Sequence, residues 1–258
     1  MSDARIPALL DGRVALVTGA ARGIGRAIAR CFASAGADVA LCDRDADGLA
    51  EVAREAEAQG RRALTAVLDV REETAVAGFF DAIARAFPRL DVLVNNAGGG
   101  FHAAFADVSA KGQDALVREN FGQVADFVRR ALPSLREGGS IINVTSIEAH
   151  RAAPGYAIYS AMKAAVANLT KTLALELGPF SITVNAIAPG YIKTERIAKA
   201  SWGMATTEAE KLFVGSLPLR RAGKPEDIAG VVAMLCSDAG AYVSGATIDV
   251  NGGWYFGP

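Results

Sequence analysis

Cysteine and histidine are scarce in this 258-residue chain, which has three of the first and two of the second. Cys31, Cys42 and Cys236 lie far apart, so they form no closely spaced pair of the kind that binds metals. His102 and His150 belong to no HExxH pattern. Each cysteine lies in an apolar stretch, as small buried residues do. We therefore expect no metal and a reducing, cytoplasmic setting.

A charge excess and a long apolar run are also missing. The 27 basic and 28 acidic residues nearly cancel, and no basic stripe suggests a nucleic-acid partner. Apolar runs such as Val231–Cys236 are far too short to span a bilayer. Residues 1–13 lack the apolar core of a signal peptide. We expect no nucleic-acid partner and no membrane contact.

Apolar residues make up 51% of the chain and recur in short runs that predict strands. The expected strands are Val14–Thr18, Val39–Asp43, Ala63–Leu68, Val92–Asn95, Ser140–Thr145, Ile182–Ala188 and Thr247–Val250. Segments with helical spacing separate them. Strands that are apolar almost throughout are typical of a parallel sheet covered on both faces. The alternation predicts one α/β domain over residues 1–258, a doubly wound, Rossmann-type parallel sheet of about seven strands with helices on both faces.

Residues 191–216 depart from this alternation of strands and helices. They have mixed polarity and no clear strand, with Trp202 and Gly203 near their middle. A long insertion before the last strand is often a lid or a binding loop. We predict a substrate lid here, and a plain pair of surface helices is the alternative.

A glycine-rich loop, residues 18–25, follows the first predicted strand and opens a helix near Ile24. Glycines let a pyrophosphate approach the backbone, and a helix N-terminus offers N–H donors and a positive dipole end. The spacing is Gly-x3-Gly-x-Gly, which differs from the common dinucleotide pattern. Its place between strand and helix favours nucleotide binding. The candidate contacts are Gly19, Arg22, Gly23, Ile24 and Gly25.

Asp43 ends the second predicted strand, where an acid can hydrogen-bond the adenosine ribose hydroxyls. It would also repel a 2′-phosphate, by roughly 4 kcal/mol for charges about 4 Å apart at an effective dielectric near 20. Asp43 therefore favours NAD over NADP, although Arg22 and Arg44 are suited to phosphate. Alternatively, Asp43 only caps the next helix, expected over Asp45–Gln59.

Two further strand ends carry candidate cofactor contacts. Asp69, followed by Val70, is placed to reach the adenine edge or is simply a turn acid. The stretch Asn95–Gly98, with Gly99 and Gly100 after it, would let a ligand pass close to the backbone. Its candidates are Asn96, Ala97 and Gly98. The alternative is a glycine-rich turn whose asparagines bind their own chain.

Tyr159 and Lys163 are four residues apart on a predicted helix and so share one face. A tyrosine has a pKa of about 10, and a nearby ammonium lowers it. The pair therefore makes a tuned acid–base group. Ser146 follows the fifth predicted strand, at the edge where ligand sites of open α/β sheets gather. Its hydroxyl could hold the substrate oxygen or only cap a turn.

Together these residues resemble the classical short-chain dehydrogenase/reductase family. The resemblance covers essentially the whole chain and includes Pro189-Gly190, Thr194 and the ending Asp249–Gly253. It implies that Tyr159 exchanges a proton with the substrate oxygen. Lys163 would lower the pKa of Tyr159 and hold the nicotinamide ribose. Ser146 would orient and polarise the carbonyl.

The same resemblance implies roles for other positions. Asn120 matches a helix asparagine that supports a water-linked proton relay, or else is a plain polar helix residue. The segment from Pro189 through Gly190 to Thr194 would wrap the nicotinamide, with the backbone of Ile192 near its carboxamide. The family is usually a homodimer or homotetramer built on two long helices. Here we expect them at Ser109–Arg136 and Gly155–Leu177.

The sequence thus predicts an oxidoreductase that moves a hydride between NAD(H) and a secondary alcohol or ketone. One alternative is an NADPH-dependent 3-oxoacyl-[acyl-carrier-protein] reductase. The other is a non-catalytic NAD(H)-binding sensor or scaffold. Several loop side chains either touch substrate or are ordinary surface and packing residues. These are Phe101, His102, Glu148, His150, Arg151, Tyr156, Tyr191 and Trp202.

Overall fold

A computed structural model of the chain describes residues 9–195 and 207–255. Within them, the strands form a single parallel sheet in the order β3-β2-β1-β4-β5-β6-β7. The strands are β1 (Val14–Thr18), β2 (Asp38–Asp43), β3 (Ala63–Val67), β4 (Leu90–Asn95), β5 (Leu135–Val144), β6 (Thr183–Pro189) and β7 (Thr247–Val250). The predicted fold class, a doubly wound parallel sheet, is confirmed.

One strand is longer than its sequence indicated. β5 begins at Leu135, five residues before the expected Ser140. Leu135 pairs with Leu90 of β4, and the register then shifts until Val92 pairs with Ser140. Gly138 in the bulge has a φ of +79°, which favours glycine. The polar, glycine-containing stretch between the two pairs carries no strand pattern, so sequence alone missed it.

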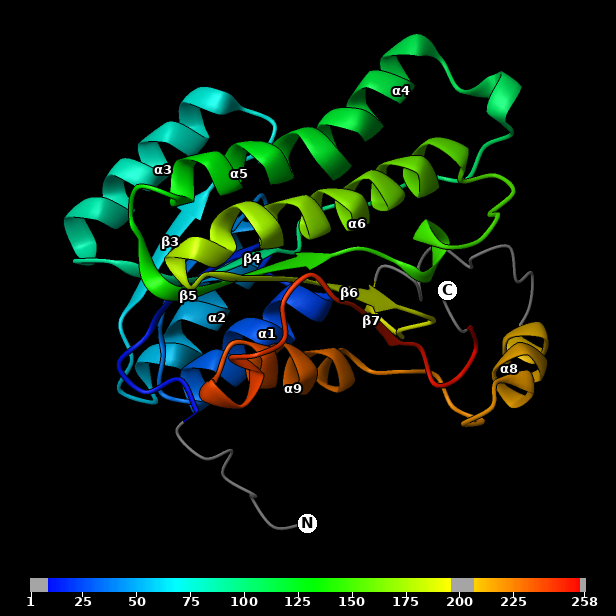
Figure 1. Ribbon diagram of the computed structural model, residues 1–258. Coiled ribbons are helices and arrows are strands. Elements are labelled where there is room, and N and C mark those ends of the chain that lie inside the picture. Colours follow the sequence, from blue (N-terminus) through cyan, green and yellow to red (C-terminus); the bar gives the residue numbers. More distant parts are fainter. Residues whose placement is uncertain (1–8, 196–206, 256–258) are drawn as a thin grey trace.

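Helices cover both faces of the sheet (Figure 1). One layer holds α1 (Gly23–Ser34), α2 (Ala46–Glu57) and α9 (Pro225–Leu235). The other holds α3 (Glu73–Ala86), α4 (Ala110–Val117), α5 (Gln123–Ala131) and α6 (Ala157–Leu177). Two buried apolar cores separate these layers from the sheet, with Phe32 in one and Phe127 in the other. α8 (Thr207–Ser216) lies at the edge of the molecule, beyond β7.

The first of the two expected central helices is not one continuous α-helix. Residues 110–131 form α4, a π-helical turn η2 (Arg118–Gly122) and α5. The helix stops at Ala131 instead of the expected Arg136, because Pro133 has no backbone N–H to continue the helical hydrogen bonds. A π-turn inside a helix often marks a functional site, and this one contains Asn120.

A buried polar chain fastens α6 to the sheet. Asn95 of β4 donates from Nδ2 to Oδ1 of Asn143 on β5, at 2.9 Å. Asn143 donates from Nδ2 to Oγ1 of Thr170 on α6, also at 2.9 Å. Thr170 in turn donates to the carbonyl oxygen of Val166, at 2.9 Å. Since all three polar side chains are essentially inaccessible to solvent, these bonds fix how α6 lies on the strands.

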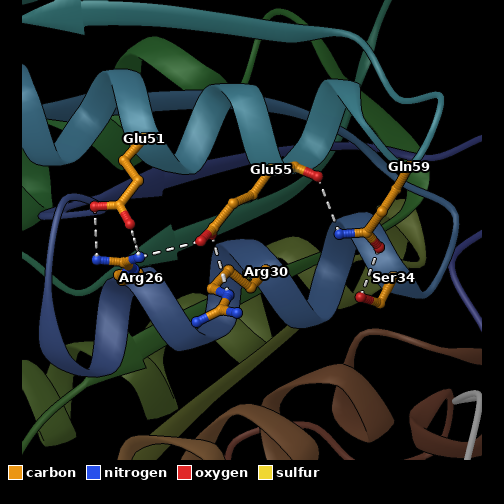
Figure 2. A network of polar contacts seen from close by, with 6 residues as sticks. All are labelled: Arg26, Arg30, Ser34, Glu51, Glu55 and Gln59. Atoms are coloured by element: carbon orange, nitrogen blue, oxygen red, sulfur yellow. Dashed lines mark hydrogen bonds and ion pairs between the residues drawn. The ribbon is translucent and has the colours of Figure 1, made fainter. Parts of the chain in front are cut away.

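On the other face, a polar network joins α1 to α2 (Figure 2). The Arg26 guanidinium donates to both carboxylate oxygens of Glu51, at 3.2 and 2.7 Å, and to Glu55 at 3.1 Å. Forked arginine–carboxylate pairs fix geometry more strongly than single contacts do. The network includes Arg26, Arg30, Ser34, Glu51, Glu55 and Gln59. It holds α2, which directly follows the end of β2, against α1.

Replacing Thr170 by valine should lower the free energy of unfolding by about 1–3 kcal/mol. The substitution keeps the shape but leaves Nδ2 of Asn143 without its buried acceptor. Urea denaturation measures the change. Thr172→Val on the exposed side of the same helix is the matched control and should change stability by less than about 0.5 kcal/mol. Equal effects of the two substitutions would contradict the role given to the buried chain.

Candidate active site

A cavity of about 1010 Å³ opens at the carboxyl ends of the strands. Its walls come from the turns that follow β1 to β6 and from the first turns of α6. Of the residues predicted for the site, Gly25 and Asn120 do not line it. Those that do are Gly19, Arg22, Gly23, Ile24, Asp43, Asp69, Val70, Asn96, Ala97, Gly98, Ser146, Tyr159, Lys163, Pro189, Gly190, Ile192 and Thr194.

The glycine loop has the backbone shape that an anion cradle needs. Gly19 and Gly23 have φ values of +66° and +56°, a region that side chains rarely adopt. A Cβ on Gly25 would lie 2.0 Å from the carbonyl oxygen of Gly19. Gly25 therefore lets α1 pack directly on the loop, although it does not touch the cavity. No side chain caps α1 at Arg22, and the first turn of α1 holds no acid.

The turns after β1 and β4 are tied together. Oγ1 of Thr18 accepts hydrogen bonds from the backbone N–H groups of Asn96 and Ala97, at 3.0 and 2.9 Å. Nδ2 of Asn96 donates back to the carbonyl oxygens of Thr18 and Gly19, at 2.9 and 3.1 Å. Asn96 thus binds the neighbouring turn and not its own, and Thr18 is a structural member of the site that sequence reasoning did not single out.

Asp43 lies at the mouth of the cavity beside the glycine loop. Its Oδ2 accepts from the N–H of Ala21 at 3.1 Å, and its Oδ1 accepts from the N–H groups of Arg44 and Asp45 at 2.7 and 3.1 Å. The cap of α2 is Asp45, which accepts from the N–H of Gly48. The alternative that Asp43 caps this helix is therefore wrong.

The carboxylate of Asp69 is held by a neighbouring arginine. Arg71 donates to it from Nε at 2.9 Å, from Nη2 at 2.5 Å and from the backbone at 3.0 Å. Arg44 lies 3.7 Å away on the other side. Hydrogen bonds from Arg71 lower the pKa of Asp69 to about 2. Asp69 is a turn acid that also lines the cavity, and its contact with the adenine edge stays a prediction.

Tyr159 and Lys163 face the cavity from α6, as their spacing predicted. Lys163 is buried and donates from Nζ to the carbonyl oxygen of Val144, at 2.8 Å. The same Nζ lies 5.6 Å from the centre of the Tyr159 ring. A Cβ on Gly100 would come within 3.2 Å of that ring, so this glycine makes room for the tyrosine.

Ser146 sits at the end of β5, where it caps a short 3-10 turn, η3 (Ile147–Ala149). Its Oγ accepts a hydrogen bond from the backbone N–H of Glu148, at 3.2 Å. Ser146 also lines the cavity that contains Tyr159. The capping role and a place in the site are therefore compatible.

Asn120 is fully buried beneath the cavity wall. Its Oδ1 accepts from the N–H of Gly99 at 3.0 Å, and its Nδ2 donates to the carbonyl oxygens of Gly99 at 2.7 Å and Leu116 at 3.0 Å. Among the described residues, Asn120 therefore holds the turn that follows β4 through its hydrogen bonds to Gly99. The sequence did not indicate these hydrogen bonds.

Glu148 and Arg151 are not the exposed loop residues that the sequence allowed. The Glu148 side chain is only 6% exposed and pairs with Nη2 of Arg151 at 3.0 Å. The guanidinium carbon of Arg151 lies 4.3 Å from the ring centre of Trp254. Glu148 and Trp254 line the cavity, as do Phe101, His102 and Tyr156.

Part of the predicted lid, with Trp202, lies outside the described residues. Tyr191 is buried and donates from its hydroxyl to Oε1 of Glu210 on α8, at 3.0 Å. Burial, and then this bond to Glu210, raise the pKa of Tyr191 to about 12. The Tyr191 ring also meets Phe213 of α8, with centres 5.2 Å apart. These contacts dock α8 beside the site.

Within residues 9–195 and 207–255, no group of three or more His, Cys, Asp or Glu side chains could hold a metal ion. No helix in those same ranges is long and apolar enough to cross a membrane.

Comparison with known proteins identifies the family of this chain. A family model described as enoyl-(acyl carrier protein) reductase matches residues 19–255. Cyclohexanol dehydrogenase from Rhodococcus sp. is 40% identical over 264 aligned residues, covering 95% of this chain and 96% of the relative.

Solved structures agree with these sequence matches. A short-chain dehydrogenase/reductase from Serratia marcescens has a TM-score of 0.88 at 34% identity, covering 95% of this chain and 99% of its own. A blue fluorescent protein from a metagenomic library, in complex with NADPH, has a TM-score of 0.88 at 34% identity, covering 96% and 100%. The agreement of sequence, fold and site over almost the whole length shows that the chain belongs to the classical short-chain dehydrogenase/reductase family of oxidoreductases.

Proposed function

We propose that this protein transfers a hydride between NAD(H) and a secondary alcohol or ketone, with Tyr159 as the acid–base group. The observation that carries the proposal is that one cavity joins the glycine loop and Asp43 to Ser146, Tyr159 and Lys163. A nucleotide held by the loop would extend toward the reacting groups. The substrate panel to test begins with cyclohexanol, since a relative is named for that alcohol.

The residues on the cavity wall fit a dinucleotide. Left-handed glycines and an uncapped helix N-terminus suit its pyrophosphate. Asp43 suits the adenosine ribose, and Asp69 with Val70 would border the adenine. The nicotinamide end would lie against Pro189, Gly190, Ile192 and Thr194. When bound, this ring accepts the hydride in oxidation and supplies it in reduction.

Tyr159 and the side chains near it would each have one role in the chemistry of the substrate oxygen. In oxidation the Tyr159 phenolate takes the hydroxyl proton while the hydride leaves the carbon, which forms the carbonyl. In reduction Tyr159 returns its proton to the oxygen. The Lys163 ammonium favours the phenolate and so lowers the pKa of Tyr159. Ser146 orients the substrate oxygen through its Oγ, and Asn120 supports the proton relay.

Asp43 supports NAD over NADP. Its two oxygens accept three backbone hydrogen bonds, and an ionised carboxylate has room for about four. One ribose hydroxyl can therefore donate to it, whereas a 2′-phosphate would meet its negative charge. Arg22 and Arg44, which line the same cavity, act in the opposite direction.

The alternative within the family is an NADPH-dependent 3-oxoacyl-[acyl-carrier-protein] reductase. The matching family model is described as enoyl-(acyl carrier protein) reductase, which supports only the acyl-carrier-protein part of this candidate, and Asp43 opposes the NADPH part. A non-catalytic sensor or scaffold would keep the fold and lose the reacting groups. Ser146, Tyr159 and Lys163 are all present on the cavity wall, so we prefer the enzyme.

The chain organisation belongs to the same proposal. We propose one domain over residues 1–258, located in the cytoplasm, with residues 191–216 as a substrate lid. The docking of α8 through Tyr191 and Phe213 supports a lid that borders the site. A homodimer or homotetramer would pair the long helices, and the 82% exposed side chain of Leu175 on α6 is an apolar contact suited to it.

Tyr159→Phe should lower kcat by about 10²–10⁴-fold, because it removes the proton that general acid–base catalysis transfers. NADH absorbance during incubation with NAD and a panel of secondary alcohols measures this. Tyr242→Phe, at a fully exposed position, is the control and should react like the wild type. Equal rates in the Tyr159→Phe and wild-type proteins would refute the proposed mechanism.

Lys163→Ala should lose activity and also weaken cofactor binding, because the ammonium both tunes Tyr159 and holds the nicotinamide ribose. Titration followed by NADH fluorescence separates the two effects. Lys171→Ala, on the exposed side of α6, should bind NADH normally. If Lys163→Ala bound NADH as tightly as the control, the ribose contact would be wrong.

Asp43→Ala should narrow the preference for NAD over NADP by at least about tenfold in kcat/KM, since it removes a charge worth roughly 4 kcal/mol at most. Asp43→Asn should do the same and still accept backbone hydrogen bonds. Asp47→Asn, an exposed acid on α2, is the control. If neither Asp43 variant changed the ratio of kcat/KM with NAD to kcat/KM with NADP, the assignment of Asp43 to the ribose would be wrong.

A further inference from the structure

One acidic side chain on the cavity wall has no part in the proposed hydride transfer. Glu148 follows Ser146 by two residues, and its backbone N–H lies 3.2 Å from Oγ of Ser146. The two side chains thus start from the same short turn, beside the atom that would hold the reacting oxygen. Glu148 also lines the cavity that contains Ser146 and Tyr159, so its side chain is a candidate for contact with the substrate.

The carboxylate of Glu148 is buried yet incompletely used. Arg151 donates to Oε1 from Nη2 at 3.0 Å and to Oε2 from Nε at 3.5 Å, a weak contact. A carboxylate can accept about four hydrogen bonds. Its side chain is 6% exposed, and the residue borders the cavity. The carboxylate therefore keeps acceptor capacity beyond its contacts with Arg151.

Arg151 is held in turn, so Glu148 has a fixed position. The guanidinium carbon lies 4.3 Å from the ring centre of Trp254, within range of a cation–π interaction. Trp254 also meets Phe213 of α8, with ring centres 5.1 Å apart and planes at 76°. A charge pair anchored in this way is an oriented hydrogen-bond acceptor.

The same cavity also has aromatic side chains in its lining. Phe101, Tyr156 and Trp254 line the same cavity as Glu148. Pockets of this composition bind the apolar faces of a ligand, while a few placed polar groups set its orientation. A ring with a hydroxyl at one edge matches both features.

We infer that Glu148 is a specificity-determining residue that selects cyclic alcohols with a second hydroxyl next to the reacting carbon. The second O–H donates to the Glu148 carboxylate, and the ring packs against Trp254. This inference rests on the proposed function. A site built to hydrogen-bond a substrate hydroxyl discriminates strongly against an analogue that lacks it, because a buried polar group then loses a partner.

The test compares cyclohexanol with cis- and trans-1,2-cyclohexanediol. For the wild type, kcat/KM should be at least about tenfold higher for one of the diols. Glu148→Gln should reduce that ratio, and Glu148→Leu should reduce it to about one. Glu57→Gln, an exposed acid on α2, repeats the carboxylate-to-amide change away from the site and should keep the wild-type ratio. Thermal melting of each variant shows that it folds.

Binding supplies a second measurement that does not depend on turnover. Calorimetry with the wild-type protein and NADH should show tighter binding of a diol than of cyclohexanol, and Glu148→Leu should remove the difference. Equal affinities in the wild type, or a difference that survives Glu148→Leu, would overturn the inference. Absence of Tyr159-dependent NADH formation with any alcohol would instead count against the proposed function, and the binding comparison would still decide on Glu148.

Discussion

The pairing of the turns after β1 and β4 is the constraint on which the site depends. These two strands are neighbours in the sheet, yet the chain continues from β1 toward one face and from β4 toward the other. Their turns diverge, and ligands of open α/β sheets bind in the crevice that results. Thr18 and Asn96 hold the two turns together by four hydrogen bonds. The crevice thereby has a defined shape before a cofactor enters it.

The reacting groups are placed by a second set of contacts, made on the face of the sheet that α6 covers. The chain from Asn95 through Asn143 to Thr170 fixes the helix on the strands, and Lys163 adds a bond to the end of β5. Gly100 has no side chain, and this leaves room for the Tyr159 ring. The positions of Tyr159 and Lys163 thus depend on buried polar bonds between α6 and the sheet, as a preorganised site requires.

A third group of contacts lies at the part of the cavity wall that includes Glu148 and Trp254. Glu148, Arg151 and Trp254 connect the turn after β5 with the C-terminal segment, and Phe213 continues the contact to α8. These residues come from three separate parts of the chain. Specificity is built on such loops, whereas the sheet supplies the common frame.

The sequence by itself determined the strands, the glycine loop and the Tyr159–Lys163 pair. Each of these is a local pattern: an apolar run, a glycine spacing, or an i, i+4 relation on a helix. The tertiary structure decided the extension of β5, the π-turn at Asn120 and the burial of Glu148. It also showed that Asn96 binds the turn of another strand. Such features depend on contacts between residues that are dozens of positions apart, and no local spacing records which distant groups meet.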